Sequence, residues 1–183
     1  MRKFQIGVMG SVSDLNYSKA AEKAAERLGY SIARSGAVLF FGAEKDYDSL
    51  STAACRGAKK GKGMTVGVTY GKHKNIWQKD ADIIIPSGLE RGGGRELVLT
   101  LSCDAIIAIS GGSGTLTELA IAYQADIPMV ALKGFGGWAD ELAGKFFDGR
   151  KRRKVLLAKT PEEAVKIAIA EAKKYREKYE SQK

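Results

Sequence analysis

Residues 104–118 read DAIIAISGGSGTLTE. Residues 105–109 form an uninterrupted apolar run, which is typical of a strand buried on both faces of a parallel sheet. A turn of glycine and serine follows at 110–114, and Thr115 opens the next helix. The first N–H groups of a helix have no partner inside it and lie at the positive end of the helix dipole. The stretch therefore predicts a cradle for a phosphate group.

Outward from this stretch, short apolar runs alternate with longer amphipathic ones. Strands are expected at 4–9, 37–41, 64–69, 83–85, 105–109, 130–132 and 155–157. Strands that alternate with helices imply right-handed crossovers, so the expected fold class is α/β: a three-layer, Rossmann-like fold with a doubly wound, mostly parallel sheet. The chain has no linker, repeat or second zone of composition, so residues 1–183 are expected to form a single nucleotide-binding domain.

The helices are recognised by their ends. They are expected at 18–28, ended by Gly29, at 50–60, ended by Gly61, and from Arg95, Thr115 and Thr160 onward. The last helix has the clearest start, because Thr160 can cap it, Pro161 suits its first position and Glu163 can bond back to the cap. Its tail from Lys173 is charged and is expected to fray.

The composition narrows the class of function. The chain carries a formal net charge of +9, much of it in basic clusters at 59–62, 72–74 and 150–154. Such clusters attract polyanions. Each cluster lies at a predicted helix end or loop, however, where lysine and arginine complement the helix dipole. A solvated surface that attracts anionic ligands is therefore favoured over a nucleic-acid groove.

No membrane-spanning, export or metal-binding segment is expected. No apolar run reaches the roughly 18 residues that a membrane span needs. The apolar start of the chain runs directly into the turn Gly10-Ser11, as a first buried strand would. Cys55 and Cys103 offer neither a disulfide framework nor a metal-ligand spacing, and both are expected to be buried. These features predict a cytoplasmic protein.

Glycines gather where the predicted strands end. Ligands of such sheets bind beyond the carboxyl ends of the strands, and glycine lets the backbone approach a ligand closely. The candidate phosphate- and ligand-binding residues are Gly10, Ser11, Gly42, Gly92, Gly93, Gly94, Ser110, Gly111, Gly112, Ser113, Gly114 and Thr115. The turn is neither a Walker sequence, because no lysine follows its last glycine, nor the dinucleotide fingerprint. A monophosphate or similar group fits it better than a triphosphate.

Two side chains near the turn are the candidate catalytic residues. Glu118 has the capping-box spacing from Thr115, in which it would bond back to the Thr115 N–H. Alternatively, its carboxylate faces the group attached to the phosphate, where it could polarise a water or stabilise positive charge on a sugar ring. The helix dipole disfavours Arg95 at a helix start unless an anion is near, so Arg95 is expected to hold phosphate, a carboxylate or a hydroxyl. The glycine-rich segment 134–138 is expected to close over the ligand or to be mobile.

The run from residue 95 to residue 118 resembles the LOG-like family of Rossmann-type proteins. That family has the motif P-G-G-x-G-T-x-x-E, with an arginine fifteen positions before the proline, and Arg95 stands at this distance from Ser110. The residues that match the motif in place are Gly111, Gly112, Gly114, Thr115 and Glu118, with Ser110 at the proline position.

This resemblance implies an activity and an assembly. In the cytokinin-activating members, the arginine and glutamate are the proposed catalytic pair for hydrolysis of the N-glycosidic bond of a nucleoside 5′-monophosphate. For this chain, the resemblance implies that Glu118 assists water attack or stabilises the oxocarbenium-like ribose, and that Arg95 orients the ribose or base. The glycine turn would hold the 5′-phosphate, and no metal or organic cofactor would be required. It also implies a homodimer or homotetramer, packed through the helix faces that follow Arg95 and Glu118.

Three departures from the motif set this chain apart. Ser110 replaces the proline, Glu96 replaces a lysine after the key arginine, and residues 41–43 replace a second motif of three glycines. With these departures, the chain resembles a sub-branch of the family. That sub-branch includes molybdenum-cofactor carrier proteins and uncharacterised relatives of the DNA-processing protein DprA. The alternative function implied is non-catalytic binding or carriage of a nucleotide or pterin phosphate. A DNA-binding, DprA-like protein is the third hypothesis.

Overall fold

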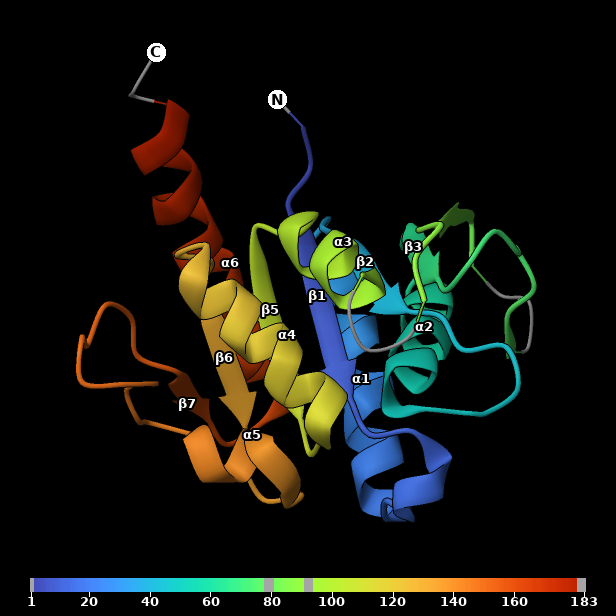
Figure 1. Ribbon diagram of the computed structural model, residues 1–183, viewed down its shortest axis with the longest axis horizontal. Coiled ribbons are helices and arrows are strands. Elements are labelled where there is room, and N and C mark those ends of the chain that lie inside the picture. Colours follow the sequence, from blue (N-terminus) through green and yellow to red (C-terminus); the bar gives the residue numbers. More distant parts are fainter. Residues whose placement is uncertain (1, 78–80, 91–93, 181–183) are drawn as a thin grey trace.

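The computed structural model describes residues 2–77, 81–90 and 94–180. Seven strands form one sheet in the order β4-β3-β2-β1-β5-β6-β7, and each pairing between these strands is parallel (Figure 1). The strands are β1 (Gln5–Gly10), β2 (Val38–Gly42), β3 (Thr65–Thr69), β4 (Ile83–Pro86), β5 (Ala105–Ile109), β6 (Met129–Leu132) and β7 (Leu156–Ala158). The predicted α/β, Rossmann-like class is confirmed.

Helices cover both faces of this sheet. The helices are η1 (Ser13–Leu15), α1 (Lys19–Arg34), α2 (Leu50–Lys60), α3 (Arg95–Leu101), α4 (Ser113–Gln124), α5 (Gly137–Leu142) and α6 (Pro161–Glu180). One apolar cluster joins the sheet to α1, α2 and α6. A second joins it to α3, α4 and α5, which lie in front of the sheet in Figure 1. The two clusters create the three expected layers.

Strand β5 illustrates why the strand sequences lack a polar–apolar alternation. Ile107 and Ile109 belong to the first apolar cluster, whereas Ile106 and Ala108 belong to the second. All five residues of the strand are buried. Because helices cover both faces of the sheet, both sets of side chains must be apolar.

The prediction that Gly29 ends the first helix is wrong. Helix α1 continues to Arg34, and Gly29 lies against α2, where an added Cβ would stand 1.7 Å from the carbonyl oxygen of Ala54. Gly57 of α2 has the same role, because its Cβ would stand 1.8 Å from the carbonyl oxygen of Glu26. Close packing of the two helices outweighs the roughly 1 kcal/mol that glycine costs inside a helix. Gly61, by contrast, follows α2 as predicted.

The expected fraying of the chain from Lys173 is also wrong. Helix α6 continues to residue 180, and Arg176 is buried. Its guanidinium pairs with Asp104 at 2.8 Å and lies over the ring of Phe4 at 4.1 Å. The long-range ion pair between Arg176 and Asp104 therefore holds the end of α6 in place, although the charged sequence of this segment is typical of a solvent-exposed tail. Across the described parts of the chain, no helix has the combination of length and apolarity that crossing a membrane requires.

Candidate functional site

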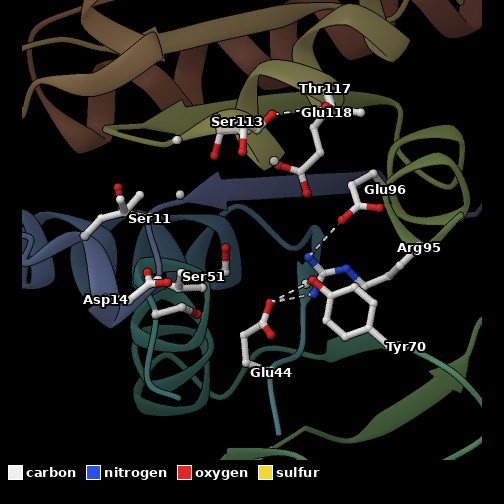
Figure 2. Close-up of a pocket in the computed structure, with 18 residues that line it drawn as sticks. Ser11, Asp14, Glu44, Ser51, Tyr70, Arg95, Glu96, Ser113, Thr117 and Glu118 are labelled. Atoms are coloured by element: carbon white, nitrogen blue, oxygen red, sulfur yellow. Dashed lines mark hydrogen bonds and ion pairs between the residues drawn. The ribbon is translucent and has the colours of Figure 1, made fainter. Parts of the chain in front are cut away.

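A cavity of about 290 Å³ opens where the carboxyl ends of the central strands meet the first turns of α3 and α4 (Figure 2). This is the edge of the sheet at which the glycines predict a ligand. The predicted residues that line the cavity are Gly10, Ser11, Gly42, Arg95, Gly112, Ser113, Gly114, Thr115 and Glu118. Ser110, Gly111 and Gly94 do not line it. Gly92 and Gly93 lie outside the described residues.

One end of the cavity is the start of α4. The helix begins at Ser113, with Gly112 in the capping position and without a side-chain cap. The first N–H groups of the helix, from Ser113 to Thr115, have no acceptor within it. Ser113, Gly114 and Thr115 all line the cavity. This end of the cavity therefore offers uncharged hydrogen-bond donors and a helix dipole suited to an anion.

Two serine hydroxyls hold the turn that precedes α4. The Ser11 hydroxyl accepts a hydrogen bond from the Gly111 N–H at 2.8 Å and donates one to the Ser110 hydroxyl at 3.0 Å. Ser110 has φ of 54°, which proline, with φ fixed near −65°, cannot adopt. The replacement of the motif's proline by serine thus agrees with the backbone of the turn.

The glycine-rich segment 134–138 lies behind this turn and does not line the cavity. The N–H groups of Trp138 and Ala139 donate to the carbonyl oxygens of Gly111 and Ser110 at 3.0 and 2.9 Å. Gly137 packs so closely that an added Cβ would stand 2.5 Å from the Gly111 oxygen. The expectation of a segment that closes over the ligand is replaced by a segment that supports the turn from the other side.

The other end of the cavity is built around Arg95. Its side chain is only 8% exposed, and its Nη1 donates to Oε1 of Glu44 at 2.8 Å. Its guanidinium also lies 3.5 Å from Glu96 and 4.0 Å from the centre of the Tyr70 ring. Gly42 leaves room for this arrangement, because an added Cβ would stand 3.0 Å from Nη1. Arg95 therefore already has carboxylate partners within the chain, whereas the sequence alone predicts that its guanidinium binds phosphate, a carboxylate or a hydroxyl of a ligand.

Opposing influences act on the pKa of Arg95. Burial disfavours the charged guanidinium, but the nearby charge of Glu44, followed by Tyr70 and Glu118, raises its pKa overall. The Arg95 guanidinium thus stays positively charged at this end of the cavity. It lies among carboxylates that would otherwise repel one another.

Glu118 points into the cavity from the second turn of α4 (Figure 2). Of the two alternatives for Glu118, the capping box is excluded, because the helix is capped at Gly112 and Thr115 already lies inside it. Glu118 is only 5% exposed, and burial raises its pKa to about 8. Arg95 opposes this rise, whereas the charges of Glu96 and Glu44 add to it. With this raised pKa, the Glu118 carboxyl group keeps its proton near neutral pH and is able to donate a hydrogen bond.

Sequence reasoning missed three residues of this end of the cavity: Glu44, Glu96 and Tyr70. Glu44 and Glu96 were visible only as departures from the family motif, one beside the altered glycine segment 41–43 and one beside Arg95. Both are 4% exposed. Within the described residues, no group of three or more histidine, cysteine, aspartate or glutamate side chains is arranged to hold a metal ion. The carboxylates instead surround an arginine.

Among the residues that the structure describes, Oε2 of Glu96 and Nε of Arg95 are buried polar atoms without a hydrogen-bond partner. Most buried polar atoms in proteins are hydrogen-bonded, and an unpaired one costs free energy. Glu96 lines the cavity, so a ligand could supply what the protein does not.

Part of the positive charge of the basic clusters noted in the sequence is paired within the chain. Arg150 pairs with Asp148, and Arg153 pairs with Asp126. In the cluster 59–62, the first two lysines pair with carboxylates of neighbouring elements. These pairings reduce the positive field that a nucleic-acid groove would need.

Comparison with known proteins agrees with this geometry. Residues 3–165 match the SLOG cluster4 family. The chain belongs to this family. This confirms the suspected relationship to the LOG-like Rossmann proteins and, through the structures below, the predicted sub-branch.

Three solved structures resemble this SLOG cluster4 protein. The molybdenum cofactor binding protein of Rippkaea orientalis is 32% identical, with 93% of this chain and 98% of that chain covered and a TM-score of 0.78. The molybdenum cofactor carrier protein of Chlamydomonas reinhardtii is 30% identical, with the same coverage and a TM-score of 0.78. DNA processing protein A of Streptococcus pneumoniae is 16% identical, covers 90% of this chain and 61% of its own, and has a TM-score of 0.61. At that identity it shares the fold alone.

Proposed function

We propose that this SLOG cluster4 protein binds and carries a phosphate-bearing pterin of the molybdenum-cofactor type without converting it. The observation that carries this proposal is the similarity over 93% of the chain to a protein that binds the molybdenum cofactor and to one that carries it. The cavity supports the proposal by its size, since about 290 Å³ lies near the lower end of small-molecule sites.

The phosphate of such a ligand is assigned to the start of α4. The N–H groups of Ser113, Gly114 and Thr115, with the helix dipole, suit an anion without requiring a lysine or arginine. Gly10 and Gly112 let the ligand approach the backbone there. Ser11 and Ser110 act through the turn, because their hydroxyls bond to it and to each other.

The phosphoribohydrolase implied by the LOG-like motif is supported less well by the same cavity. In the roles implied by the motif, an ionised Glu118 would activate water or stabilise a cationic ribose. Burial instead raises the pKa of Glu118 to about 8. Arg95 is likewise occupied by Glu44. Both residues are better suited to hold a ligand than to act on one.

Mass spectrometry of the small molecule that copurifies with the protein tests the proposal, followed by calorimetry with a phosphorylated pterin. We expect a pterin, or heat of binding, without turnover. Release of base from nucleoside 5′-monophosphates would contradict carriage and favour the hydrolase. Glu118→Gln sharpens the distinction: an amide can still donate a hydrogen bond, so binding persists, whereas hydrolysis would be abolished.

We also propose that the chain forms a homo-oligomer through the outer faces of α3 and α4. Between these helices lies a groove of about 620 Å³. Its lining contains no charged side chain among the described residues: Leu97, Leu101, Leu116, Thr117, Ala120, Ile121, Gln124 and Ala125. Thr117 lines the groove and also the ligand cavity, so a second copy seated there would adjoin the ligand.

Light scattering during size-exclusion chromatography tests this assembly. Leu101→Glu should lower the particle mass, because a buried unpaired carboxylate opposes an apolar contact. Met64→Glu is the matched control, since Met64 is also an exposed apolar residue but lies outside the groove. Equal masses for all three proteins would exclude this face as the interface.

A further inference from the structure

The two ends of the ligand cavity differ in the hydrogen bonds that they can make. The start of α4 presents N–H groups and hydroxyls, which are donors suited to an anion. The opposite end presents the carboxyl groups of Glu96 and Glu118 beside Arg95, and Figure 2 shows Glu118 between Ser113 and Glu96. A phosphate would be attracted to the first end and repelled by the second. A ligand must therefore lie with its phosphate at α4 and another group at the carboxyl end.

The carboxyl end has hydrogen-bonding capacity that the protein itself does not use. Oε2 of Glu96 is buried and has no hydrogen-bond partner in the described parts of the chain. No hydrogen bond is found for the Glu118 carboxyl group among the described residues, although this residue is 5% exposed and lines the cavity. Such buried groups are costly unless a ligand pairs with them.

The protonation of the two groups makes them chemically different. The pKa of Glu118 is raised to about 8, mainly by burial, so its carboxyl group donates near neutral pH. Glu96 forms an ion pair with the Arg95 guanidinium at 3.5 Å, and its Oε2 is an acceptor that no described residue uses. The Glu118 carboxyl group is then a donor and the Glu96 carboxyl group an acceptor. Such a pair complements a ring edge on which a carbonyl oxygen lies next to N–H groups.

We propose that Glu118 and Glu96 recognise the edge of a 2-amino-4-oxopyrimidine ring, the edge that pterin and guanine share. Glu118 donates to the ring carbonyl oxygen, and Glu96 accepts from the ring N–H and the exocyclic amino group. This inference rests on the proposed function and names the ring that the cavity selects. It assigns specificity to two side chains that stand apart from the phosphate cradle.

Other rings fit this edge poorly. Adenine presents an amino donor where the carbonyl would be and a ring nitrogen acceptor beside it, which reverses the order. A ring with a carbonyl in place of the 2-amino group would direct an oxygen at the Glu96 carboxylate, leaving two acceptors facing each other. Rejection of such analogues is strong when a buried polar group is left unpaired.

A matched pair of ligands tests the inference by calorimetry on the full-length protein. We expect 6-hydroxymethylpterin phosphate to bind about tenfold or more tightly than the lumazine analogue, whose 2-amino group is replaced by oxygen. Guanosine 5′-monophosphate should likewise bind more tightly than inosine 5′-monophosphate, which lacks the amino group. Affinities within threefold for both pairs would overturn the inference, but measurable binding of the phosphates would leave the proposed function standing. If none of these ligands binds, the proposed function itself is overturned.

The variant Glu96→Gln identifies the residue responsible. Because the amide keeps the shape but replaces one acceptor oxygen by a donor, the preference for pterin over lumazine should fall below about threefold. Binding of ribose 5-phosphate, which reports on the phosphate cradle and the fold, should be unchanged. Glu141→Gln, on an exposed part of α5, is the control and should keep the full preference. A preference that persists in Glu96→Gln would overturn the assignment to Glu96.

Discussion

The two ends of the cavity are built in different ways. The start of α4 and the turn before it come from one contiguous stretch, residues 110–115, and offer mainly backbone groups. The end around Arg95 brings together side chains from four separate places, including Glu44, which lies 51 positions away in the sequence. The first end depends on local backbone geometry, and the second on long-range packing.

The difference has energetic consequences. Backbone N–H groups at a helix start are uncharged and remain partly hydrated, so changes beside them alter binding more than stability. The buried carboxylates and guanidinium are tied to one another, because removal of one charge leaves the others uncompensated. We therefore expect variants at the carboxyl end to act first on stability and those at the phosphate end on affinity.

The largest effect is expected from the pH dependence of stability. The pKa of Glu118 is raised from 4.5 to about 8, so its bound proton stabilises the fold fully below pH 4.5 and this contribution is lost as the pH rises through 8. It corresponds to roughly 5 kcal/mol. Urea unfolding at pH 5, 7 and 9 should show a steeper loss of stability for the natural chain than for Glu118→Gln. Parallel pH profiles would contradict the raised pKa.

Arg95→Met should lower the free energy of unfolding by about 3–5 kcal/mol, because it removes a buried cation that pairs with both Glu44 and Glu96. The matched control is Arg27→Met, which breaks an exposed pair with Glu162 and should cost about 0–1 kcal/mol. Denaturant midpoints of the two variants provide the comparison. Equal losses would mean that burial of the Arg95 pair has no special cost.

Gly112→Ala tests the phosphate end. An added Cβ would meet only the far end of the Leu15 side chain, at 2.8 Å, so the fold should tolerate it, but the methyl group narrows the cavity. Affinity for a phosphorylated pterin should fall about tenfold with little change in unfolding free energy. Gly149→Ala, where an added Cβ meets no atom within 4 Å, should leave both unchanged. If Gly112→Ala lowers the free energy of unfolding but not the affinity, the start of α4 would behave as we expect of the end around Arg95, and the proposed contrast would be wrong.

The smallest effect is expected for Ser11→Ala. This change leaves the Gly111 N–H without its acceptor and should lower the free energy of unfolding by about 1 kcal/mol. Ser113→Ala, on the exposed first turn of α4, should change it by less than about 0.5 kcal/mol. Thermal unfolding of both variants measures the difference. Indistinguishable curves would mean that the Ser11 hydroxyl is not needed to hold the turn.

The parts of this protein that could be predicted from its sequence are those set by neighbouring residues. The uninterrupted apolar run of β5 and the glycine turn after it predicted a strand covered on both faces and a helix start suited to phosphate. Arg95 and Glu118 were singled out by spacing and position, and both line the cavity. Their expected roles, as a phosphate-binding fork and as either a capping or an ionised catalytic group, depended on neighbours that the sequence does not reveal.

The α/β architecture and the glycine turn before a helix start were predictable from the sequence, because apolar periodicity and helix-start signals arise within short segments. Only the tertiary structure decided that Gly29 is a helix contact rather than a helix end and that Arg176 anchors the last helix to Asp104. It also decided that Arg95 is neutralised by Glu44, which gives the cavity two chemically distinct ends. The physical reason is that the charge state and the partners of a buried group depend on burial and on long-range contacts, which spacing along the chain does not encode.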